Sequence, residues 1–267
     1  MRKPVQPPKP VRVEHLESLA RGLGVLELFG NADKHELTMP EVAERMTMTR
    51  AAAMRALATL ESLNYLHRTD RSYSLAPRVL ALGYAYLASL GFRAVAKPIV
   101  ENLRTNTGET CSLGVLDGGD VLYVARAEAR RIVRIDLAVG SRLPAYINSM
   151  GRVLLSALRD VELDAYLAGL EPVAATPLTV TDKAELRKRI VAVRRDGHCF
   201  IDGEVERGIA GLATPIHDRD GRIIAALNLS LAFSRRTKKE IAQIMLPKLA
   251  AGAREIEAIL HNDLPIR

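Results

Sequence analysis

Residues 38–75 read TMPEVAERMTMTRAAAMRALATLESLNYLHRTDRSYSL, and this stretch decides the first half of the fold. Thr38 and Glu41 have the spacing at which a threonine and a glutamate cap the start of a helix, so a short helix is predicted there. A polar break at 47–49 and a second helix over about 49–64 follow. Two short helices joined by a tight turn are typical of a helix-turn-helix, but an ordinary pair of core helices has the same pattern.

The hairpin after these helices favours a DNA-binding unit. Alternation over 66–75 predicts two short strands around a polar tip, with Tyr73 and Leu75 facing inward, and such a hairpin would form a wing. The segment from Arg45 to Arg78 holds six arginines and two acidic residues, so positive charge gathers in this part of the chain. Alanines beside the arginines of the second helix would let its backbone approach the floor of the DNA major groove.

We therefore predict DNA contacts from the second helix and from the wing. The arginines would reach bases or phosphates, although an arginine on a helix or a turn is often only a solvated surface residue, and for Arg71 the two interpretations are equal. The predicted DNA-binding residues are Thr49, Arg50, Ala51, Ala52, Arg55 and Arg71.

Apolar periodicity predicts one helix before this stretch and one after it. Apolar residues recur at helical spacing at Leu19, Leu23, Leu26 and Phe29. Residues 78–92 carry a second apolar stripe, on a helix that would link two halves of the protein. That stripe fits either a dimer seam or packing on the N-terminal domain. The winged helix-turn-helix domain is predicted to span 14–77.

The composition describes a soluble protein with room for two domains. The chain has 267 residues, of which 48% are apolar and 26% charged. No run approaches the ~18 consecutive apolar residues that a membrane span needs. Residues 1–13 are basic and rich in proline, which predicts a disordered tail rather than a signal peptide. The net charge of +7 favours an anionic partner, with nucleic acid first.

Cysteines and catalytic motifs argue against an extracellular protein and against an enzyme. Cys111 and Cys199 form no Cys-x-x-Cys pair, so neither a disulfide framework nor a thiolate metal site is predicted, and a reducing cytoplasm fits. The sequence lacks the motifs of serine hydrolases, phosphate loops and zinc proteases. His198, Cys199 and His217 make a poor metal set, because adjacent residues of a strand point to opposite faces. We expect no metal, no cofactor and no catalytic residue.

Residues 93–263 are predicted to form a second domain that mixes helices and strands. The predicted helices are 94–104, 151–158, 161–167, 182–195 and 238–260, the last of them kinked at Pro247. The predicted strands are 111–116, 121–127, 132–137 and a final pair on either side of 218–221. In the last strand, leucines alternate with Asn228 and Ser230, so its polar face either meets solvent or lines a pocket.

Several segments, in order along nearly the whole chain, resemble the IclR family of bacterial regulators. They are SLARGL at 18–23, TRAAA at 49–53, PRVLALGY at 77–84, RLPAY at 142–146 and SMGRVLL at 149–155. VLDG at 115–118 and AALNLS at 225–230 are similar to the branch of that family that controls aromatic-acid breakdown through the β-ketoadipate pathway. The resemblance implies an α+β protein, with an N-terminal winged helix-turn-helix and a C-terminal GAF-like α/β effector-binding domain built on a mainly antiparallel sheet.

The same resemblance implies the walls of an effector cavity. The implied lining residues are Ile135, Ser149, Met150, Asp202, Ile209, Gly211, Asn228 and Ser230. Met150 and Gly211 depart from the wider family, which often has alanine and cysteine at these places. The volume of the cavity is therefore not predicted. A helix that begins near Ser149 would direct free amides and the positive end of its dipole at a carboxylate. Arg152 would either add positive charge there or face solvent.

These features predict a DNA-binding regulator that responds to a small anionic metabolite. Asp202 would repel a bound carboxylate unless it accepts from a ligand hydroxyl or holds a loop, and a hydroxylated aromatic acid accommodates both features. The expected partners are double-stranded operator DNA, a small carboxylate effector and further copies of the chain, as a homodimer or a dimer of dimers on a palindromic site. The alternatives are a regulator of this type with an unrelated effector, and a small-molecule enzyme with an accessory DNA-binding domain.

Overall fold

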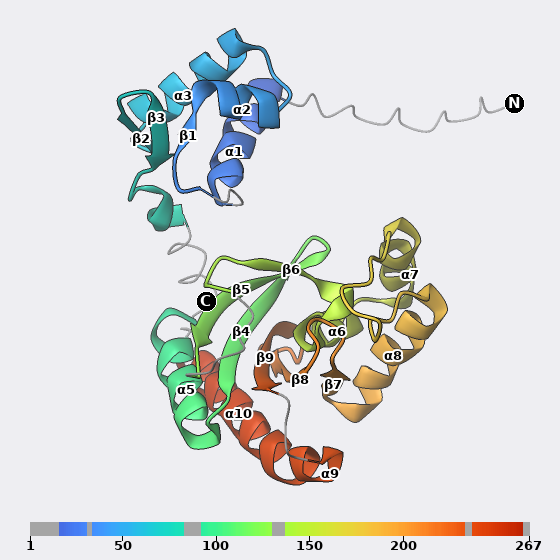
Figure 1. Ribbon diagram of the computed structural model, residues 1–267. Coiled ribbons are helices and arrows are strands. Elements are labelled where there is room, and N and C mark those ends of the chain that lie inside the picture. The colour runs from blue at the N-terminus through green and yellow to red at the C-terminus, as the bar shows by residue number, and fades with distance from the viewer. Residues whose placement is uncertain (1–15, 31–33, 83–91, 130–136, 233–236, 264–267) are drawn as a thin grey trace, which may run out of the picture. The chain divides into compact units, whose positions relative to one another are not determined.

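The chain forms two compact units, which divide after Ala85 (Figure 1). The computed structural model describes residues 16–30, 34–82, 92–129, 137–232 and 237–263. The division lies within 78–92, where a linker helix is predicted; 79–82 are helical, and 83–91 lie outside the described residues. The predicted tail at 1–13 also lies outside them.

In its described residues before 76, the first unit combines three helices with a small antiparallel sheet. Its elements are α1 (Glu17–Gly30), β1 (Leu37–Thr38), α2 (Met39–Arg45), α3 (Arg50–Ser62), β2 (Leu66–Thr69) and β3 (Ser72–Leu75), with the strands in the order β1-β3-β2. The two short helices and the hairpin that follows them have the arrangement of a winged helix-turn-helix, as the sequence predicts. A core that includes Phe29, Val42, Leu57 and Tyr73 holds these elements together.

Side-chain caps begin both helices of the helix-turn-helix. The N–H and Oγ1 of Thr38 both donate to Glu41 at 2.8 Å, which is the capping box predicted for α2. The Oγ1 of Thr49 accepts from the N–H of Ala52 at 3.2 Å and caps α3. The turn between the helices is therefore fixed by residues close together in sequence.

The apolar stripe predicted on α1 is only partly buried, and the inward orientation predicted for Leu75 is wrong. In α1, Leu19 and Leu23 are 59% and 50% exposed, and Val25 packs in the core beside Phe29 instead. In the wing, Leu75 is exposed while Tyr73 faces inward. Periodicity identifies an apolar face of a helix, but it does not say which neighbour covers that face.

The second unit is a six-stranded antiparallel sheet with helices on both faces. Its strands are β4 (Thr110–Asp117), β5 (Asp120–Ala127), β6 (Arg142–Pro144), β7 (Cys199–Asp202), β8 (Ile209–His217) and β9 (Ile223–Ala232), in the order β6-β5-β4-β9-β8-β7. Its helices are α5 (Phe92–Thr107), α6 (Ser149–Ser156), α7 (Asp160–Gly169), α8 (Lys183–Asp196), α9 (Lys238–Glu240) and α10 (Leu246–Asp263). The α+β fold class is thus confirmed.

The alternation in β9 assigns the two faces of the sheet. Leu227, Leu229 and Leu231 belong to a core shared with α5 and α10, which lie side by side in Figure 1. The neighbouring Ala226 belongs to a second core formed with α6, α7 and α8 on the other face. Asn228 and Ser230 share the face of Ala226, so they lie under α6 and not on a solvent face.

In the second unit, one predicted strand lies mostly outside the described residues, and a predicted helix kink takes another form. The strand predicted at 132–137 falls largely on 130–136, which lie outside the described residues, and Leu137 is in neither a helix nor a strand. The kink predicted at Pro247 is instead a π turn at Ile241–Met245 directly before α10. A π turn is a wider helical turn, and it lets the helix continue into a proline that has no N–H to donate. In the described part of the chain, no helix is long and apolar enough to cross a membrane.

Candidate DNA-binding surface and effector cavity

The exposed side of α3 carries the predicted DNA-binding residues. Arg50, Ala51 and Arg55 are exposed, Ala52 is half-buried, and Thr49 lies at the N-terminus of the helix as its cap. Neither arginine forms an ion pair with a described residue, so both guanidinium groups are available to an anionic partner. The N-terminal end of α3 also presents the positive end of the helix dipole, which favours phosphate nearby.

The wing places further positive charge at its tip. Arg71 is exposed at the turn between β2 and β3, next to Asp70, whose φ of 53° lies in the left-handed region. Arg68, which was not among the predicted contacts, donates from Nε to the carbonyl of Asp70 at 3.2 Å and lies over the ring of Tyr73. These contacts order the tip of the hairpin, so Arg68 supports the wing in addition to any contact with DNA.

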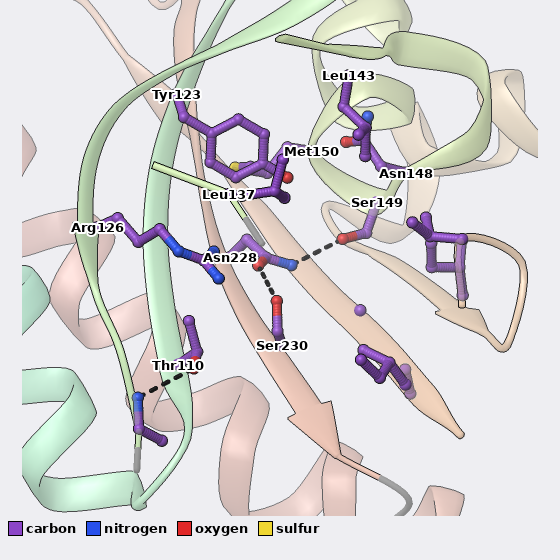
Figure 2. A pocket seen from close by; sticks show the side chains of 16 residues that line it. Thr110, Tyr123, Arg126, Leu137, Leu143, Asn148, Ser149, Met150, Asn228 and Ser230 are labelled. Atoms are coloured by element: carbon purple, nitrogen blue, oxygen red, sulfur yellow. Dashed lines mark hydrogen bonds between the residues drawn. The ribbon is translucent and has the colours of Figure 1, made fainter. Parts of the chain in front are cut away.

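In the second unit, a cavity lies between the sheet and the N-terminal end of α6 (Figure 2). Six residues predicted from the family resemblance line it: Ser149, Met150, Ile209, Gly211, Asn228 and Ser230. The other lining residues are Thr110, Tyr123, Arg126, Ala129, Leu137, Leu143, Asn148, Ile201, Val205 and Ala210. The cavity is thus bounded by all six strands of the sheet, by α6 and by the loop between β7 and β8.

A hydrogen-bonded row of polar groups crosses the floor of the cavity. Asn228 Nδ2 donates to Ser149 Oγ at 2.9 Å, and Ser230 Oγ donates to Asn228 Oδ1 at 3.1 Å (Figure 2). A β-carbon added at Gly211 would lie 2.7 Å from Ser149 Oγ, so only glycine leaves this hydroxyl in place. Sheet register brings these residues together, because Ser230 pairs with Gly211 on one side and with Thr110 on the other.

Arg126 is the one lining side chain, among the described residues, that carries a full charge at neutral pH. Its side chain is only 7% exposed and points towards Asn228 in Figure 2. Its Nη1 donates to Ser112 Oγ at 3.0 Å, and its Nε lies 3.1 Å from Glu128 Oε1. Burial raises the pKa of Tyr123 to about 12, so the phenol stays neutral. Sequence reasoning missed Arg126, because strict alternation from Tyr123 would turn it to the opposite face, and only an irregularity of the pairing between Tyr123 and Ala125 brings both side chains to the cavity.

Two predicted cavity residues do not lie in the described lining. Asp202 is exposed at the end of β7, because it follows Ile201, which points into the cavity, and so faces the opposite way. The predicted conflict between Asp202 and a bound carboxylate therefore does not arise. Ile135 lies within 130–136, outside the described residues.

Arg152 does neither of the things predicted for it, since it contacts neither solvent nor the cavity. Its side chain is 2% exposed and forms a two-pronged ion pair with Glu204, at 2.9 and 2.5 Å. Its Nε donates to the carbonyl of Tyr146 at 2.9 Å. Glu204 precedes Val205 in the loop between β7 and β8, so the ion pair joins α6 to another wall of the cavity.

Both cysteines of the second unit are free and buried. Burial raises the pKa of the Cys111 thiol, and it raises the pKa of Cys199 to about 12, so both thiols stay protonated. Among the described residues, no group of three or more histidine, cysteine or acidic side chains is arranged to hold a metal ion.

A winged helix-turn-helix and a second domain with a cavity lined by polar and apolar side chains are the features of a ligand-responsive, DNA-binding regulator. Residues 18–70 match the IclR helix-turn-helix domain, and residues 84–258 match the family described as Bacterial transcriptional regulator IclR C-terminal. The chain belongs to the IclR family of transcriptional regulators.

Similar proteins point to one part of that family. The Pca regulon regulatory protein of Pseudomonas putida is 41% identical over 244 residues, which are 91% of this chain and 84% of that protein. The p-hydroxybenzoate hydroxylase transcriptional activator of Acinetobacter baylyi is 34% identical over 92% of this chain and 93% of its own length. An IclR homolog from Microbacterium hydrocarbonoxydans, solved in complex with 4-hydroxybenzoate, is 28% identical with a TM-score of 0.80, over 91% of this chain and 98% of that one.

Proposed function

We propose that the cavity binds a hydroxylated aromatic carboxylate and that its binding changes the affinity of the protein for operator DNA. The observation that carries the proposal is Arg126, a buried cation that lines the cavity. A carboxylate loses its hydration when it enters such a site, and this cost is offset only where a cation and hydrogen-bond donors replace the water. The relatives named for Pca and p-hydroxybenzoate, and the homolog that holds 4-hydroxybenzoate, support the same chemical class.

The polar row on the cavity floor supports a ligand with a hydroxyl group. Ser149 and Ser230 are hydroxyls that can donate and accept, and the Asn228 amide lies between them. The apolar parts of Met150 and Tyr123 offer contacts to a ring. An aliphatic dicarboxylate would bury a second negative charge, for which the described lining holds no second cation, so it fits less well.

The cavity must widen to admit such a ligand. It measures about 50 Å³, whereas a cavity that binds benzene in an engineered protein measures roughly 150 Å³. Binding would therefore push the lining side chains apart, with α6 and the loop before β8 among the segments that can respond. If the ligand binds one arrangement of the protein more tightly than another by only ~1–3 kcal/mol, operator affinity changes about 5- to 150-fold.

We also infer that the chain acts on DNA as a homodimer through the α1 stripe, which comprises Leu16, Leu19 and Leu23. Leu19 and Leu23 lie on one face of the helix, Leu16 directly precedes the helix at the same spacing, and all three are exposed. Contiguous exposed apolar surface of this kind marks an interaction site. A second copy of the chain is the partner that a palindromic operator requires.

The carboxylate proposal is tested by replacing Arg126 in the full chain. Arg126→Gln removes the cation and should weaken binding of 4-hydroxybenzoate, measured by calorimetry, about 10- to 150-fold, because a hydrogen bond to a charged group is lost. Arg126→Lys keeps the charge but not the planar fork, so it should lose less. Operator affinity without ligand should stay unchanged in both variants, and the acid should be recovered unaltered after incubation.

The matched control is Arg222→Gln, which removes an arginine that is exposed on the turn between β8 and β9. This variant should bind the acid as the original chain does. Equal binding of 4-hydroxybenzoate by Arg126→Gln and the original chain would exclude Arg126 as the carboxylate contact. Failure of the original chain to bind any hydroxybenzoate would exclude the proposed effector class.

A further inference from the structure

The exposed face of α3 carries apolar side chains between its arginines. Met54 is 57% exposed, and Ala51 and Ala58 lie one turn before and one turn after it, also exposed. Residues three and four apart share one face of a helix, so these three residues form a continuous apolar strip. The opposite face of α3, which packs in the core, is formed by Ala53, Leu57 and Leu60.

The dimensions of the apolar strip match a short stretch of duplex DNA. From Ala51 to Ala58 the helix advances ~10 Å at 1.5 Å per residue, which is about three base pairs at 3.4 Å each. Arg50 and Arg55, both exposed, lie beside the strip on the same helix. The small alanines at its two ends leave Met54 as the side chain that projects furthest from the backbone.

The base edges in the major groove of DNA offer few apolar groups that this strip could contact. The base edges there are hydrogen-bond donors and acceptors, with one exception, the 5-methyl group of thymine. A donor or acceptor covered by Met54 would lose its water and gain no hydrogen bond, and that loss carries a free-energy cost. The thioether of methionine is flexible and polarisable, so it adapts to the position of a methyl group.

We propose that the apolar strip reads thymine methyl groups in the operator, with Met54 as the principal contact. The inference rests on the proposed use of α3 as the DNA-contacting helix, and it adds the chemical identity of the bases. Arg50 and Arg55 then bind phosphates or guanines on either side. Each half-site of the operator contains a thymine within the window of about three base pairs that the strip covers.

The test removes single methyl groups from the DNA. Operator sequences are first selected from random duplexes with the full chain, and each thymine of the selected site is then replaced in turn by deoxyuridine, which lacks only the 5-methyl group. At one or two positions in each half-site, affinity should fall about three- to five-fold, the value expected for one buried methyl group. Elsewhere the replacement should have no effect.

Protein variants assign the sensitive thymine to Met54. Met54→Ala should bind the thymine operator about as weakly as the original chain binds the deoxyuridine operator, and it should no longer distinguish the two. Met54→Leu retains an apolar contact and should retain the discrimination. The matched control is Leu63→Ala, which shortens a side chain that is 48% exposed at the far end of α3 and should leave discrimination unchanged.

Two results would overturn the inference. Selected operators that tolerate deoxyuridine at every position show that no methyl group is read. Equal sensitivity to deoxyuridine in the original chain and in Met54→Ala shows that another residue reads it. If the original chain selects no sequence at all, the proposed use of α3 as the DNA-contacting helix is wrong. The inference about thymine then fails with it. Met54 is exposed and alanine favours helices, so loss of folding is not expected to obscure these outcomes.

Discussion

Arg152 shows at the scale of one residue how a partner far away in sequence fixes a side chain's role. It is fully buried with Glu204, which also accepts from the N–H of Val180 at 3.2 Å and from Arg189 at 3.4 Å. Such a pair is costly to desolvate, and replacing it with apolar groups often leaves stability unchanged. Here the ion pair connects two walls of the cavity, because Ser149 on the same helix as Arg152 and Val205 next to Glu204 both line it.

Breaking this ion pair on one side should destabilise the protein strongly. Arg152→Met or Glu204→Leu leaves one buried charge without its main partner, and the free energy of unfolding should fall by about 3–5 kcal/mol. The double variant Arg152→Met/Glu204→Leu should recover most of this stability in urea unfolding. It should not recover affinity for 4-hydroxybenzoate, because the two cavity walls are no longer held in register.

The exposed pair of Arg187 and Asp164, at 2.7 Å between α8 and α7, provides the control. Replacing both of its members should alter neither stability nor ligand affinity appreciably. Full recovery of 4-hydroxybenzoate affinity in the buried double variant would reduce the role of Arg152 to stability alone.

At the scale of the element, local capping decides where the helices of the first unit begin. The N–H and the hydroxyl of Thr38 donate to Glu41 and lower the pKa of this carboxyl to about 2. A carboxyl whose pKa is lowered by folding stabilises the folded state above its ordinary pKa. That contribution is therefore complete above about pH 4.5 and is lost as the pH falls towards 2.

The capping box of α2 is tested by titrating Glu41. Its carboxyl signal in an NMR titration of the full chain should have a midpoint near 2. In Thr38→Ala, which lacks the hydroxyl donor, the midpoint should rise, and the helix should lose about 0.5–2 kcal/mol of stability. In Glu41→Gln the pH dependence contributed by this residue should disappear. A midpoint at the ordinary glutamate value in the unmodified chain would contradict the capping box.

The sequence of α1 predicts the helix but does not identify the surface that covers its apolar face. Its periodicity predicts an amphipathic helix, and the helix forms, but Leu19 and Leu23 are 59% and 50% exposed. A helix forms from its own sequence, whereas the surface that covers its apolar face belongs to another part of the chain or to another molecule.

For the whole molecule, the affinity for a palindromic operator should depend on whether two copies of the chain bind together. Leu19→Glu/Leu23→Glu introduces charges into the α1 stripe, so binding of a palindromic operator should weaken by at least about tenfold, since like charges would meet across the two-fold axis. Binding to an isolated half-site should not change. Operator titrations by fluorescence anisotropy with the two DNA duplexes separate these quantities.

Leu178→Glu places the same charge at another exposed leucine, in the second unit, and should leave both operator affinities unchanged. Palindrome binding that withstands the α1 double change would exclude the stripe as the contact between copies. The dimer would then have to form through another surface.

Features that depend on residues a few positions apart can be predicted from the sequence alone. The caps at Thr38 and Thr49, the buried face of α3 and the alternation of β9 follow from local hydrogen bonds and from the periods of helices and strands. The family resemblance added six cavity residues, because shared segments occupy equivalent places in a shared fold. These signals sufficed for the α+β fold, the winged helix-turn-helix and the class of regulator.

Contacts between side chains that are distant in the sequence become visible only in the folded protein. The tertiary structure added Arg126 to the cavity, turned Asp202 away from it, and buried Arg152 against Glu204, 52 positions further along the chain. Each outcome depends on sheet register and on helix packing, which are set by the burial of the whole core and leave no local signal. For that reason Arg126, the charge proposed to bind a carboxylate, could be located only after the strands were paired.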